Sequence, residues 1–170
     1  MKKVSKNKSV VTNTLVFRKA MNITIKTAEI KDAPGIAILT GELGYSATES
    51  QTKQWLGMIL NSAEHCAIVA KDNVGTLYGW VVVEKRVSLE TGCKAEISGL
   101  VISSNARRLG IGKKLILACE SWALQKELEK LVVSSNIKRE SSHVFYKNIG
   151  FSLNKTAHKY EKILAVSSIN

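Results

Sequence analysis

The sequence predicts an α+β fold, in which helices flank both faces of a central mixed, mostly antiparallel sheet. β-rich runs separated by turn signals recur along the chain, and helical patterns follow the first run and alternate with the later ones. The chain has 170 residues and is 45% apolar, which is enough for one core and too little for two ordinary domains. We therefore expect a single domain over residues 22–170 with the element order β-α-α-β-β-β-α-β-α-β-β.

The first strand and the first helix are expected near the start of this domain. Residues 22–28, NITIKTA, alternate apolar and polar side chains, which is typical of a half-buried strand. Asp32 suits an N-cap and Pro34 a first helical turn, so a helix is expected to run from there to about Leu43. Gly44 should end it, because glycine adopts the left-handed conformation that closes many helices.

A second helix and an antiparallel meander follow. Ser46 or Thr48 can begin this helix. Its apolar face is formed by Trp55, Leu56, Ile59 and Leu60. The β-rich runs of the meander, which are separated by turn signals such as Asp72-Asn73, are 66–71, 77–88 and 94–103. The rest of the chain is predicted to form a helix (110–127), a strand (130–135), a helix (139–148) ended by Gly150, and a closing hairpin (151–154 and 158–164).

The net charge of +11 is concentrated at the N-terminus. Residues 1–20 carry six basic residues and no acidic one, which leaves +5 for the other 150 residues. We expect residues 1–21 to be a solvated, disordered extension, with Met21 as an alternative start. Attraction to nucleic acid or to a membrane surface is the alternative use of this charge. Because neither an apolar run of about 18 residues nor a signal-peptide core is visible, a soluble cytoplasmic protein is expected.

The cysteines and histidines lack the spacing of a metal or redox site. Cys66, Cys93 and Cys119 are odd in number and far apart, so reduced thiols are expected. Cys119 falls on the apolar face of the predicted helix 110–127, where a core role is more frequent than a nucleophilic one. The histidines are scattered as well, at His65, His143 and His158. No metal is expected.

A glycine-containing turn precedes the predicted helix 110–127. The stretch NARRLGIGKKL, residues 105–115, places Gly110 and Gly112 between basic side chains. The first amides of a helix lack intrahelical partners and lie at the positive end of its dipole, so the turn favours an anion such as a phosphate. Glycines without Cβ atoms let that anion approach the backbone. An ordinary helix start with surface lysines is the alternative interpretation.

Two familiar phosphate-binding loops do not fit this turn. A Walker A loop requires a glycine where Arg107 stands and a serine or threonine where Lys114 stands. A dinucleotide-binding loop requires a third glycine where Leu115 stands, within an early βαβ unit. ATP binding by a Walker A loop is therefore excluded, and binding of a nicotinamide cofactor is not expected.

The pattern Arg-x-x-Gly-x-Gly at 107–112 resembles the acetyl-CoA pyrophosphate loop of the GNAT superfamily of N-acetyltransferases. Residues 95–103, AEISGLVIS, are similar to the fourth strand of that family, and RESSHVFYKNIGF at 139–151 is similar to its FYxxxGF signature. The predicted element order also matches the family fold. The resemblance covers most of the chain, from about residue 23 to 164, and it implies an acetyl-CoA-dependent N-acetyltransferase without a metal.

The resemblance implies a set of acetyl-CoA contacts. The pyrophosphate is expected against Arg107, Arg108, Leu109, Gly110, Ile111, Gly112 and Lys113. The acetyl-pantetheine arm is expected between two splayed strands, beside Leu100, Val101 and Ile102, where a backbone amide would polarise the thioester carbonyl. The remaining predicted cofactor contacts are Asn136 and Tyr146. Two positions depart from the family pattern, since Ser104 and Arg139 stand where many members carry proline and asparagine.

Acetyl transfer also needs a base and an acid, and the resemblance implies Glu96 and Tyr146. An alkyl amine with a pKa of about 10.4 is almost fully protonated at pH 7, so a base or a proton path is required. Glu96 stands where some protein-acetylating members carry a general base, and its apolar run would raise a carboxyl pKa. Tyr146 matches the tyrosine near the thioester sulfur and would protonate the leaving thiolate. The alternatives are a strand glutamate that faces solvent or an ion-pair partner, and a tyrosine packed at a helix end.

The sequence leaves the acceptor amine open. The resemblance places 41–50, GELGYSATES, and the hairpin near His158 beside the acceptor, with Glu42, Tyr45 and Trp55 as candidate contacts. A small molecule or a peptide amine is expected, and a homodimer is one option for the assembly. Transfer of a longer acyl group is a further alternative. A non-catalytic module of the same fold, binding acyl-CoA or nucleic acid, is the alternative from another class.

Overall fold

The computed structural model describes residues 22–164, so the predicted extension at 1–21 lies outside the described part. The chain divides into two compact units between Ser134 and Ser135. The first unit contains β1 (Thr24–Thr27), η1 (Ile30–Asp32), α1 (Ala33–Gly41), α2 (Glu49–Leu60), β2 (His65–Lys71), β3 (Leu77–Ser88), β4 (Gly92–Ile102), η2 (Ser104–Ala106), α3 (Ile111–Gln125) and β5 (Leu131–Val133). The second contains α4 (Glu140–Asn148).

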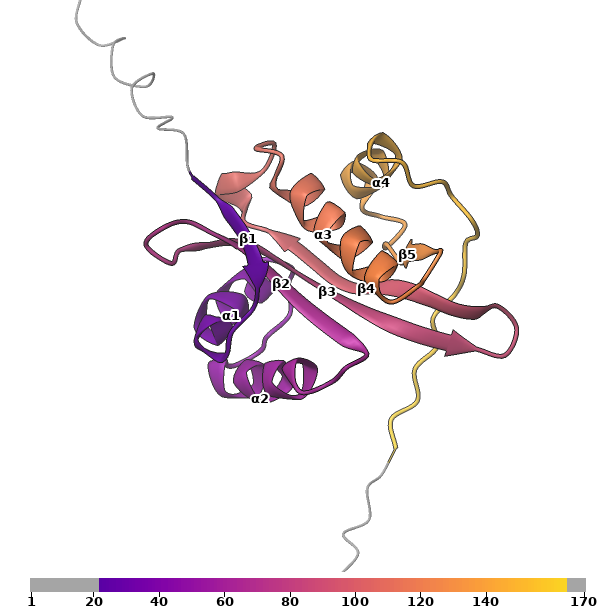
Figure 1. The fold of residues 1–170 in the computed structure, drawn as a ribbon, viewed down its shortest axis with the longest axis horizontal. Coiled ribbons are helices and arrows are strands. Elements are labelled where there is room, and N and C mark those ends of the chain that lie inside the picture. The colour runs from indigo at the N-terminus through magenta and orange to yellow at the C-terminus, as the bar shows by residue number, and fades with distance from the viewer. Residues whose placement is uncertain (1–21, 165–170) are drawn as a thin grey trace, which may run out of the picture. The chain divides into compact units, whose positions relative to one another are not determined.

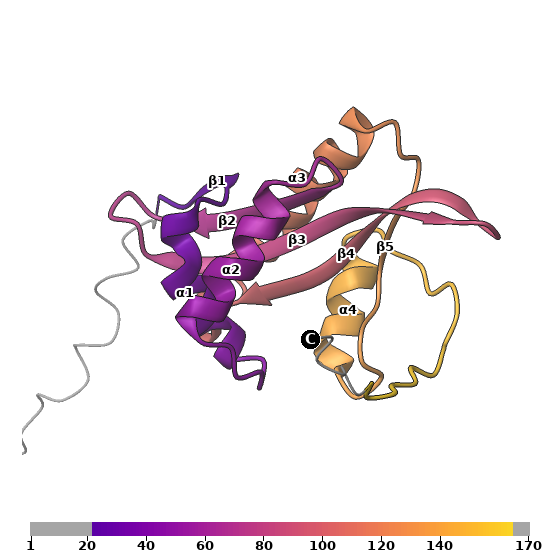
Figure 2. The same cartoon turned by 90° about the horizontal axis from the view of Figure 1, so that it is seen from below.

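The first unit is a five-stranded sheet with helices on both faces. The strand order is β1-β2-β3-β4-β5, and all neighbours are antiparallel except β4 and β5. Figures 1 and 2 show α1 and α2 on one face of this sheet and α3 on the other. These sides are called the α1/α2 face and the α3 face below. The predicted α+β class, with a mixed and mostly antiparallel sheet, is confirmed.

The strand register assigns side chains to the α1/α2 face, because residues directly opposite each other project from the same face. Val69 pairs with Trp80 and Ala67 with Val82. All of them pack with Leu56 of α2, which is buried. In the rest of the predicted apolar face, Ile59 and Leu60 are partly buried and Trp55 is 49% exposed. Thr48 is the N-cap of α2, because its hydroxyl accepts from the Gln51 amide at 3.2 Å.

The α3 face is closed by one stripe of α3. The buried residues of this helix recur at three- and four-residue spacing, which is one face of a helix. They are Ile111, Leu115, Ile116, Cys119 and Ala123. Opposite them, Val81 and Val83 of β3 are fully buried. A Cβ on Gly79 would lie 3.3 Å from Cδ1 of Leu115, so glycine allows helix and sheet to approach closely.

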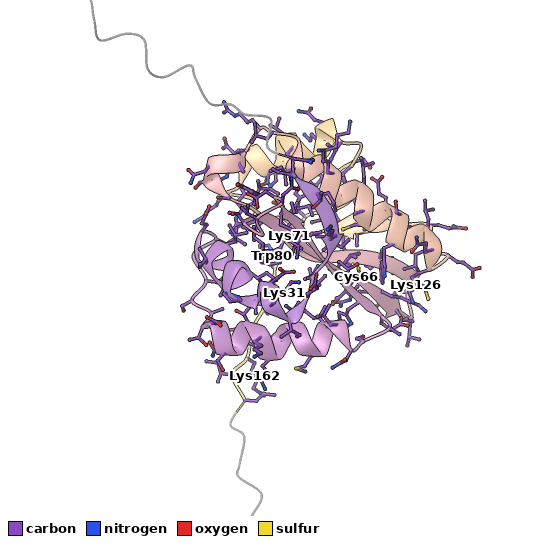
Figure 3. The ribbon with its side chains drawn as sticks, turned by 60° about the vertical axis from the view of Figure 1, so that its left-hand side comes forward. Lys31, Cys66, Lys71, Trp80, Lys126 and Lys162 are labelled. Carbon is purple, nitrogen blue, oxygen red and sulfur yellow. The ribbon has the colours of Figure 1, made fainter. Side chains whose placement is uncertain are left out.

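The start of α1 is fixed by a buried ion pair instead of the predicted cap. Asp32 occupies the N-cap position, but its side chain makes no capping bond to α1. Its carboxylate accepts from the Glu29 amide at 2.9 Å and from Nζ of Lys71 at 2.9 and 3.1 Å. Lys71, labelled in Figure 3, and Asp32 are 8% and 5% exposed. This pair holds the beginning of α1 against β2.

The largest difference from the predicted elements is the closing hairpin. The described residues 151–164 contain no strand, so the predicted hairpin at 151–154 and 158–164 is wrong for this part of the chain. Leu153, Tyr160 and Ile163 are exposed and give no buried apolar face. An isolated two-stranded hairpin is only marginally stable in water.

Smaller differences concern element ends. The first helix ends at Gly41 instead of near Leu43, and β5 has three residues where six were predicted. Among residues 22–164, no helix combines the length and the apolar character needed to cross a membrane.

Candidate functional site

The edge of β4 that faces β5 is only partly paired. The parallel ladder covers Ala95 to Ile97 of β4 and ends with the pair Ile97–Val133. Beyond Ile97, β4 continues to Ile102 while β5 stops at Val133. In the described residues, the end of β4 that contains the predicted pantetheine contacts therefore has no strand partner on this side.

The direction of two amides shows which backbone groups this open edge presents. The Ala95 amide donates to Lys130 O at 2.8 Å, toward β5, whereas the Ser103 amide donates to Tyr78 O at 2.9 Å, toward β3. Successive amides of a regular strand point to opposite neighbours, so the amides of Ala95 and Ser103, which are an even number of residues apart, would point to the same neighbour. One inserted residue between them reverses the alternation. After it, the amides of Leu100 and Ile102 point away from β3.

The inserted residue is Ser98, which forms a β-bulge. Gly99 pairs with Val82 and Ile97 with Val83, so Ser98 has no partner on β3. Bulges are frequent beside active sites, where they redirect side chains. Sequence reasoning missed this bulge, although a glycine inside a predicted strand is a known signal for one.

The predicted pyrophosphate loop leaves the start of α3 uncapped. Gly110 is the N-cap with φ +76°, and no side chain caps the helix. A Cβ on Gly110 would meet no atom within 4 Å, so the space beside it is open. Arg107, Arg108 and Leu109 are exposed. Arg108 has φ 63°, an uncommon conformation for a residue other than glycine. The loop thus combines free helix amides, an open approach and basic side chains.

Glu42, a predicted acceptor contact, binds the backbone at the end of β4. It follows α1 and accepts from the Ser104 amide at 2.7 Å and from the Ser103 hydroxyl at 3.3 Å. Ser104 stands where many members of the resembling family carry proline, which has no N–H to donate. The end of α1 is therefore tied to the residues that lead into the loop.

Glu96, the predicted base, belongs to a charged cluster on the α1/α2 face. It lies directly opposite Glu84 on β3. Nε of Arg86 is 3.6 Å from Oε2 of Glu96, and Nη1 of Arg86 is 3.5 Å from Oε1 of Glu84. His65 Nε2 lies 3.2 Å from Oε2 of Glu84. The Glu96 side chain is 21% exposed, so it keeps access to solvent despite these neighbours.

The bulge shortens the path from Glu96 to the open edge. Glu96 and Gly99 lie opposite Glu84 and Val82, which are two residues apart on β3. The Cα atoms of Glu96 and Gly99 are therefore roughly 7 Å apart, instead of the roughly 10 Å of a regular strand. A carboxylate at this distance can reach a reacting amine near Gly99 through one water.

Tyr146 and Asn136 belong to the second unit. The Tyr146 ring packs against Phe145 and Phe151, with centroid distances of 5.3 and 5.5 Å. Burial raises the pKa of the Tyr146 phenol above its ordinary value, and nearby Arg139 partly opposes this shift. Asn136 Oδ1 accepts from the Lys138 amide at 2.9 Å, in the turn that leads to α4.

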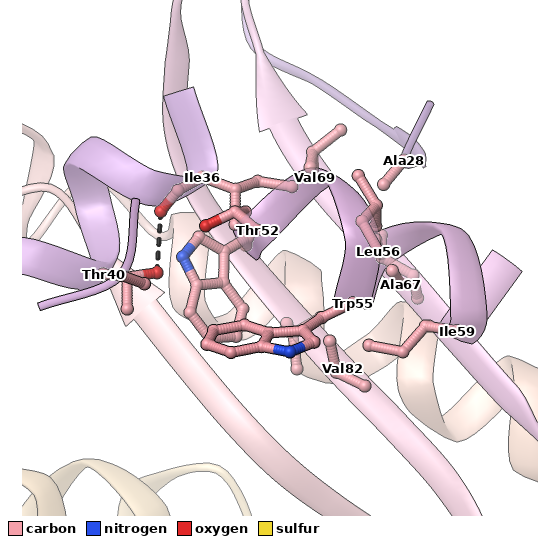
Figure 4. A pocket seen from close by; sticks show the side chains of 14 residues that line it. Ala28, Ile36, Thr40, Thr52, Trp55, Leu56, Ile59, Ala67, Val69 and Val82 are labelled. Carbon is pink, nitrogen blue, oxygen red and sulfur yellow. Dashed lines mark hydrogen bonds between the residues drawn. The ribbon is translucent and has the colours of Figure 1, made fainter. Parts of the chain in front are cut away.

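An apolar cavity of about 160 Å³ lies on the α1/α2 face. Figure 4 shows its lining side chains, including Trp55 of α2, a predicted acceptor contact. Tyr45, the other acceptor candidate of this segment, is 64% exposed and does not line it. Oγ1 of Thr52 and Nε1 of Trp80 are buried lining atoms without a hydrogen-bond partner among the described residues. Neither atom was singled out from the sequence, because a buried polar atom that lacks a hydrogen-bond partner leaves no pattern in the sequence.

The cysteines and histidines form no catalytic or metal centre in the described part. Cys66, Cys93 and Cys119 are free thiols, and burial raises the pKa of Cys119 to about 12. His143 Nε2 lies 3.0 Å from the carbonyl oxygen of Asn136. Among residues 22–164, no three His, Cys, Asp or Glu side chains gather closely enough to hold a metal ion.

Known proteins share this fold and sequence pattern. The model of the acetyltransferase (GNAT) family matches residues 36–151. Aminoglycoside N(6')-acetyltransferase type 1 from Serratia marcescens is 26% identical over 110 residues, covering 62% of this chain and 75% of the relative. The aminoglycoside 6'-N-acetyltransferase from Acinetobacter baumannii superposes with TM-score 0.74 and 16% identity, covering 85% of this chain and all of that one.

An aminoglycoside N-acetyltransferase in complex with CoA, AAC(6')-Iy, superposes with TM-score 0.76 and 16% identity, over 86% of this chain and 99% of that one. These solved structures share the fold of the chain. The family match includes most of the predicted site residues. The chain belongs to the GNAT acetyltransferase family and is an acetyl-CoA-dependent N-acetyltransferase.

Proposed function

We propose that the chain transfers the acetyl group of acetyl-CoA directly to a primary amine of a small molecule, with both substrates bound together. The observation that carries this proposal is the combination of an uncapped α3 N-terminus and an unpaired β4 edge in one unit. The first offers free amides for a pyrophosphate, and the second offers backbone groups for the pantetheine arm. The family match runs across the boundary between the two units, which supports their acting as one domain.

The amides of Leu100 and Ile102 are the proposed partners of the thioester. One of them would donate to the carbonyl oxygen and stabilise the negative charge that develops there. The amine nitrogen then forms a bond with the carbonyl carbon, and the bond from that carbon to sulfur breaks. The amine loses a proton and the leaving thiolate gains one, so the products are an amide and free CoA.

Glu96 is the proposed acceptor of the amine proton, through a water. Its exposure and its distance from Gly99 support this role, and its ion pair with Arg86 orients the carboxylate. We expect Glu96→Gln to lower kcat about 100-fold, in the usual range for loss of a general base. Glu84→Gln is the matched control, because Glu84 shares Arg86 and lies directly opposite. Equal losses in both variants would instead assign Glu96 a structural role.

Tyr146 is the proposed acid. A raised pKa keeps the phenol protonated, and therefore able to donate, throughout the neutral range. We expect Tyr146→Phe to lower kcat by a factor of at least 100, while KM for acetyl-CoA changes little. Tyr160→Phe serves as the control, because Tyr160 is 89% exposed. An unchanged kcat in Tyr146→Phe would remove this role.

Calorimetric titration of acetyl-CoA tests the cofactor site. We expect wild-type protein to bind, and Gly110→Asp to lose binding because the new carboxylate repels the pyrophosphate. Gly75→Asp is the matched control, since Gly75 also has a positive φ (+92°) and open space around it, but lies in the β2–β3 turn. Absence of binding by the folded wild-type protein would contradict the proposal, and equal losses in both variants would contradict this location.

The class of amine that accepts the acetyl group remains to be identified. The relatives are named for aminoglycosides, which makes an aminoglycoside amine one candidate. An aminoglycoside carries several positive charges and would need an acidic site. To decide between an aminoglycoside and an amine whose ring system carries no charge, the release of free CoA is measured with a panel of both kinds of amine. Acetylation of none of them, in protein that binds acetyl-CoA, would contradict transfer to a small amine.

A further inference from the structure

The cavity on the α1/α2 face has the size and lining of a site for one small ring. Its volume of about 160 Å³ is close to that of an engineered apolar cavity that binds benzene, about 150 Å³. Its walls come from α1, α2, β2 and β3, and they include the indole rings of Trp55 and Trp80. In Figure 4, Ile36 and Thr40 lie at one end, while Ile59 and Ala67 lie toward the other.

Two polar atoms of the cavity lining have no hydrogen-bond partner among the described residues. Thr52 is 6% exposed, and its Oγ1 has no hydrogen-bond partner in the described residues. The indole Nε1 of Trp80 is in the same condition. Buried donors are almost always satisfied in folded proteins, so a ligand that carries a hydrogen-bond acceptor would complete this site. Thr40 differs, because its hydroxyl already donates to Ile36 O at 2.7 Å, as the dashed line in Figure 4 shows.

The cavity borders the bulge of β4. A Cβ on Gly99 would lie 2.7 and 2.8 Å from Cζ3 and Cη2 of Trp80, so the benzo edge of this indole covers Gly99. Val82, another lining residue, pairs directly with Gly99. Leu100, the proposed donor to the thioester, is the next residue along β4. A group held in the cavity therefore lies next to the proposed reaction centre.

The charges favour a ligand with a single positive group outside the cavity. No lining residue carries a charge, so the cavity offers no carboxylate to a polycation. Glu96 lies on the same face of the sheet, beyond Val82, and can attract one ammonium group. Outside residues 1–20 the chain still carries a net charge of +5, which disfavours molecules with several positive charges.

We infer that the acceptor is a monoamine whose compact aromatic ring fills this cavity and carries one hydrogen-bond acceptor. The ring contacts the two tryptophans, its acceptor atom receives a hydrogen bond from Thr52 or Trp80, and a short tether leads the amine past Trp80 toward Gly99. This inference rests on the proposed function and names the substrate class of the same site.

The test compares amines that differ in one atom. The probes are 3- and 4-methoxybenzylamine and the 3- and 4-ethylbenzylamines of nearly equal shape, with spermidine and an aminoglycoside bearing a 6'-amine as polycations. CoA release is measured for each. We expect kcat/KM for one methoxy compound to exceed that of its ethyl analogue about three- to tenfold, the value of one neutral hydrogen bond. Both polycations should give a lower kcat/KM than this methoxy compound and its ethyl analogue.

Two variants locate the hydrogen bond. Thr52→Val removes the unpartnered hydroxyl at nearly constant shape, so the methoxy preference should fall, and it should disappear when Trp80→Phe is added. Thr40→Val is the matched control, because Thr40 lines the same cavity but its hydroxyl is satisfied. The preference should survive in Thr40→Val. Loss of the preference in Thr40→Val, or its survival in the double variant, would contradict the proposed contacts.

A binding measurement separates this inference from the proposed function. Tryptophan fluorescence, titrated with the methoxybenzylamines, reports on Trp55 and Trp80 without acetyl-CoA. We expect saturable quenching that weakens in Ala67→Val, which adds methyl groups to the cavity wall. Saturable binding without acetylation of any of the amines tested would overturn the proposed function and keep the site. Efficient acetylation of the polycations together with unchanged fluorescence would overturn this inference and keep the proposed function.

Discussion

The two faces of the sheet are held together by different means. On the α3 face, Leu115 and Cys119 pack against Val81 and Val83 with no exposed area at any of these side chains. On the α1/α2 face, the Asp32–Lys71 pair fixes the start of α1, and Glu42, the residue after α1, accepts a hydrogen bond from the Ser104 amide. A cavity remains between these helices and the sheet. Dry packing supports the fold on one side, whereas on the other an apolar cluster with a cavity is supplemented by polar contacts at the two ends of α1. A face that must admit a ligand benefits from the second arrangement.

The largest effect is expected from breaking the buried ion pair. Lys71→Met leaves the carboxylate of Asp32 buried without its partner, which typically costs roughly 3–5 kcal/mol of unfolding free energy. Urea denaturation measures this loss. Lys31→Met is the control, because the Lys31–Glu29 pair is exposed to solvent and should contribute little to stability. Equal small losses would show that polar contacts do not hold this face.

The next largest effect is expected on the α3 face. Leu115→Ala should lower the unfolding free energy by roughly 2–5 kcal/mol, because it removes buried methyl groups and leaves a cavity. Leu117→Ala lies on the same helix, but Leu117 is 48% exposed, so a change within about 0.5 kcal/mol is expected. Similar values for both variants in urea denaturation would contradict the closed packing of this face.

A pair of alanines on β2 compares the two faces directly. Ala70 pairs with Gly79 and faces α3, so Ala70→Val should overpack that side and cost roughly 1–3 kcal/mol. Ala67 lines the cavity, so Ala67→Val should be neutral or slightly stabilising. Thermal and urea unfolding of the two variants measure the difference. If Ala67→Val is the more destabilising change, the hollow is not available space.

The last prediction concerns pH. Burial raises the pKa of Cys119 from 9.0 to about 12, so the folded protein holds this proton more tightly than the unfolded chain. Stability from this group is complete below about pH 9 and is lost between pH 9 and 12, by at most about 1.4 kcal/mol per pH unit. Urea unfolding between pH 8.5 and 10.5 should show a flatter decline in Cys119→Ala. Identical slopes would show that solvent reaches this thiol.

Much of the first unit could be predicted because its hydrophobic periodicity and its turn and capping signals are strong. The meander, α2 with Thr48, and the apolar stripe of α3 follow from local periodicity and capping. Ser98 escaped prediction, because a bulge depends on the register of a neighbouring strand. Glu42 stays a predicted acceptor contact, and its hydrogen bonds to Ser103 and Ser104, about sixty residues away, had no signal in the sequence. Contacts over such distances are set by topology and not by local sequence.

The contact between Glu42 and Ser104 has an evolutionary consequence. Ser103 is extended, with φ −49° and ψ 135°, a conformation that tolerates a following proline. The ψ of Ser103 is compatible with proline at position 104, and the serine amide differs from proline in that it binds the Glu42 carboxylate. A proline there would leave Glu42 without this partner. We expect the two positions to vary together among relatives, with an acidic residue at 42 wherever 104 is not proline, which an alignment of relatives can refute.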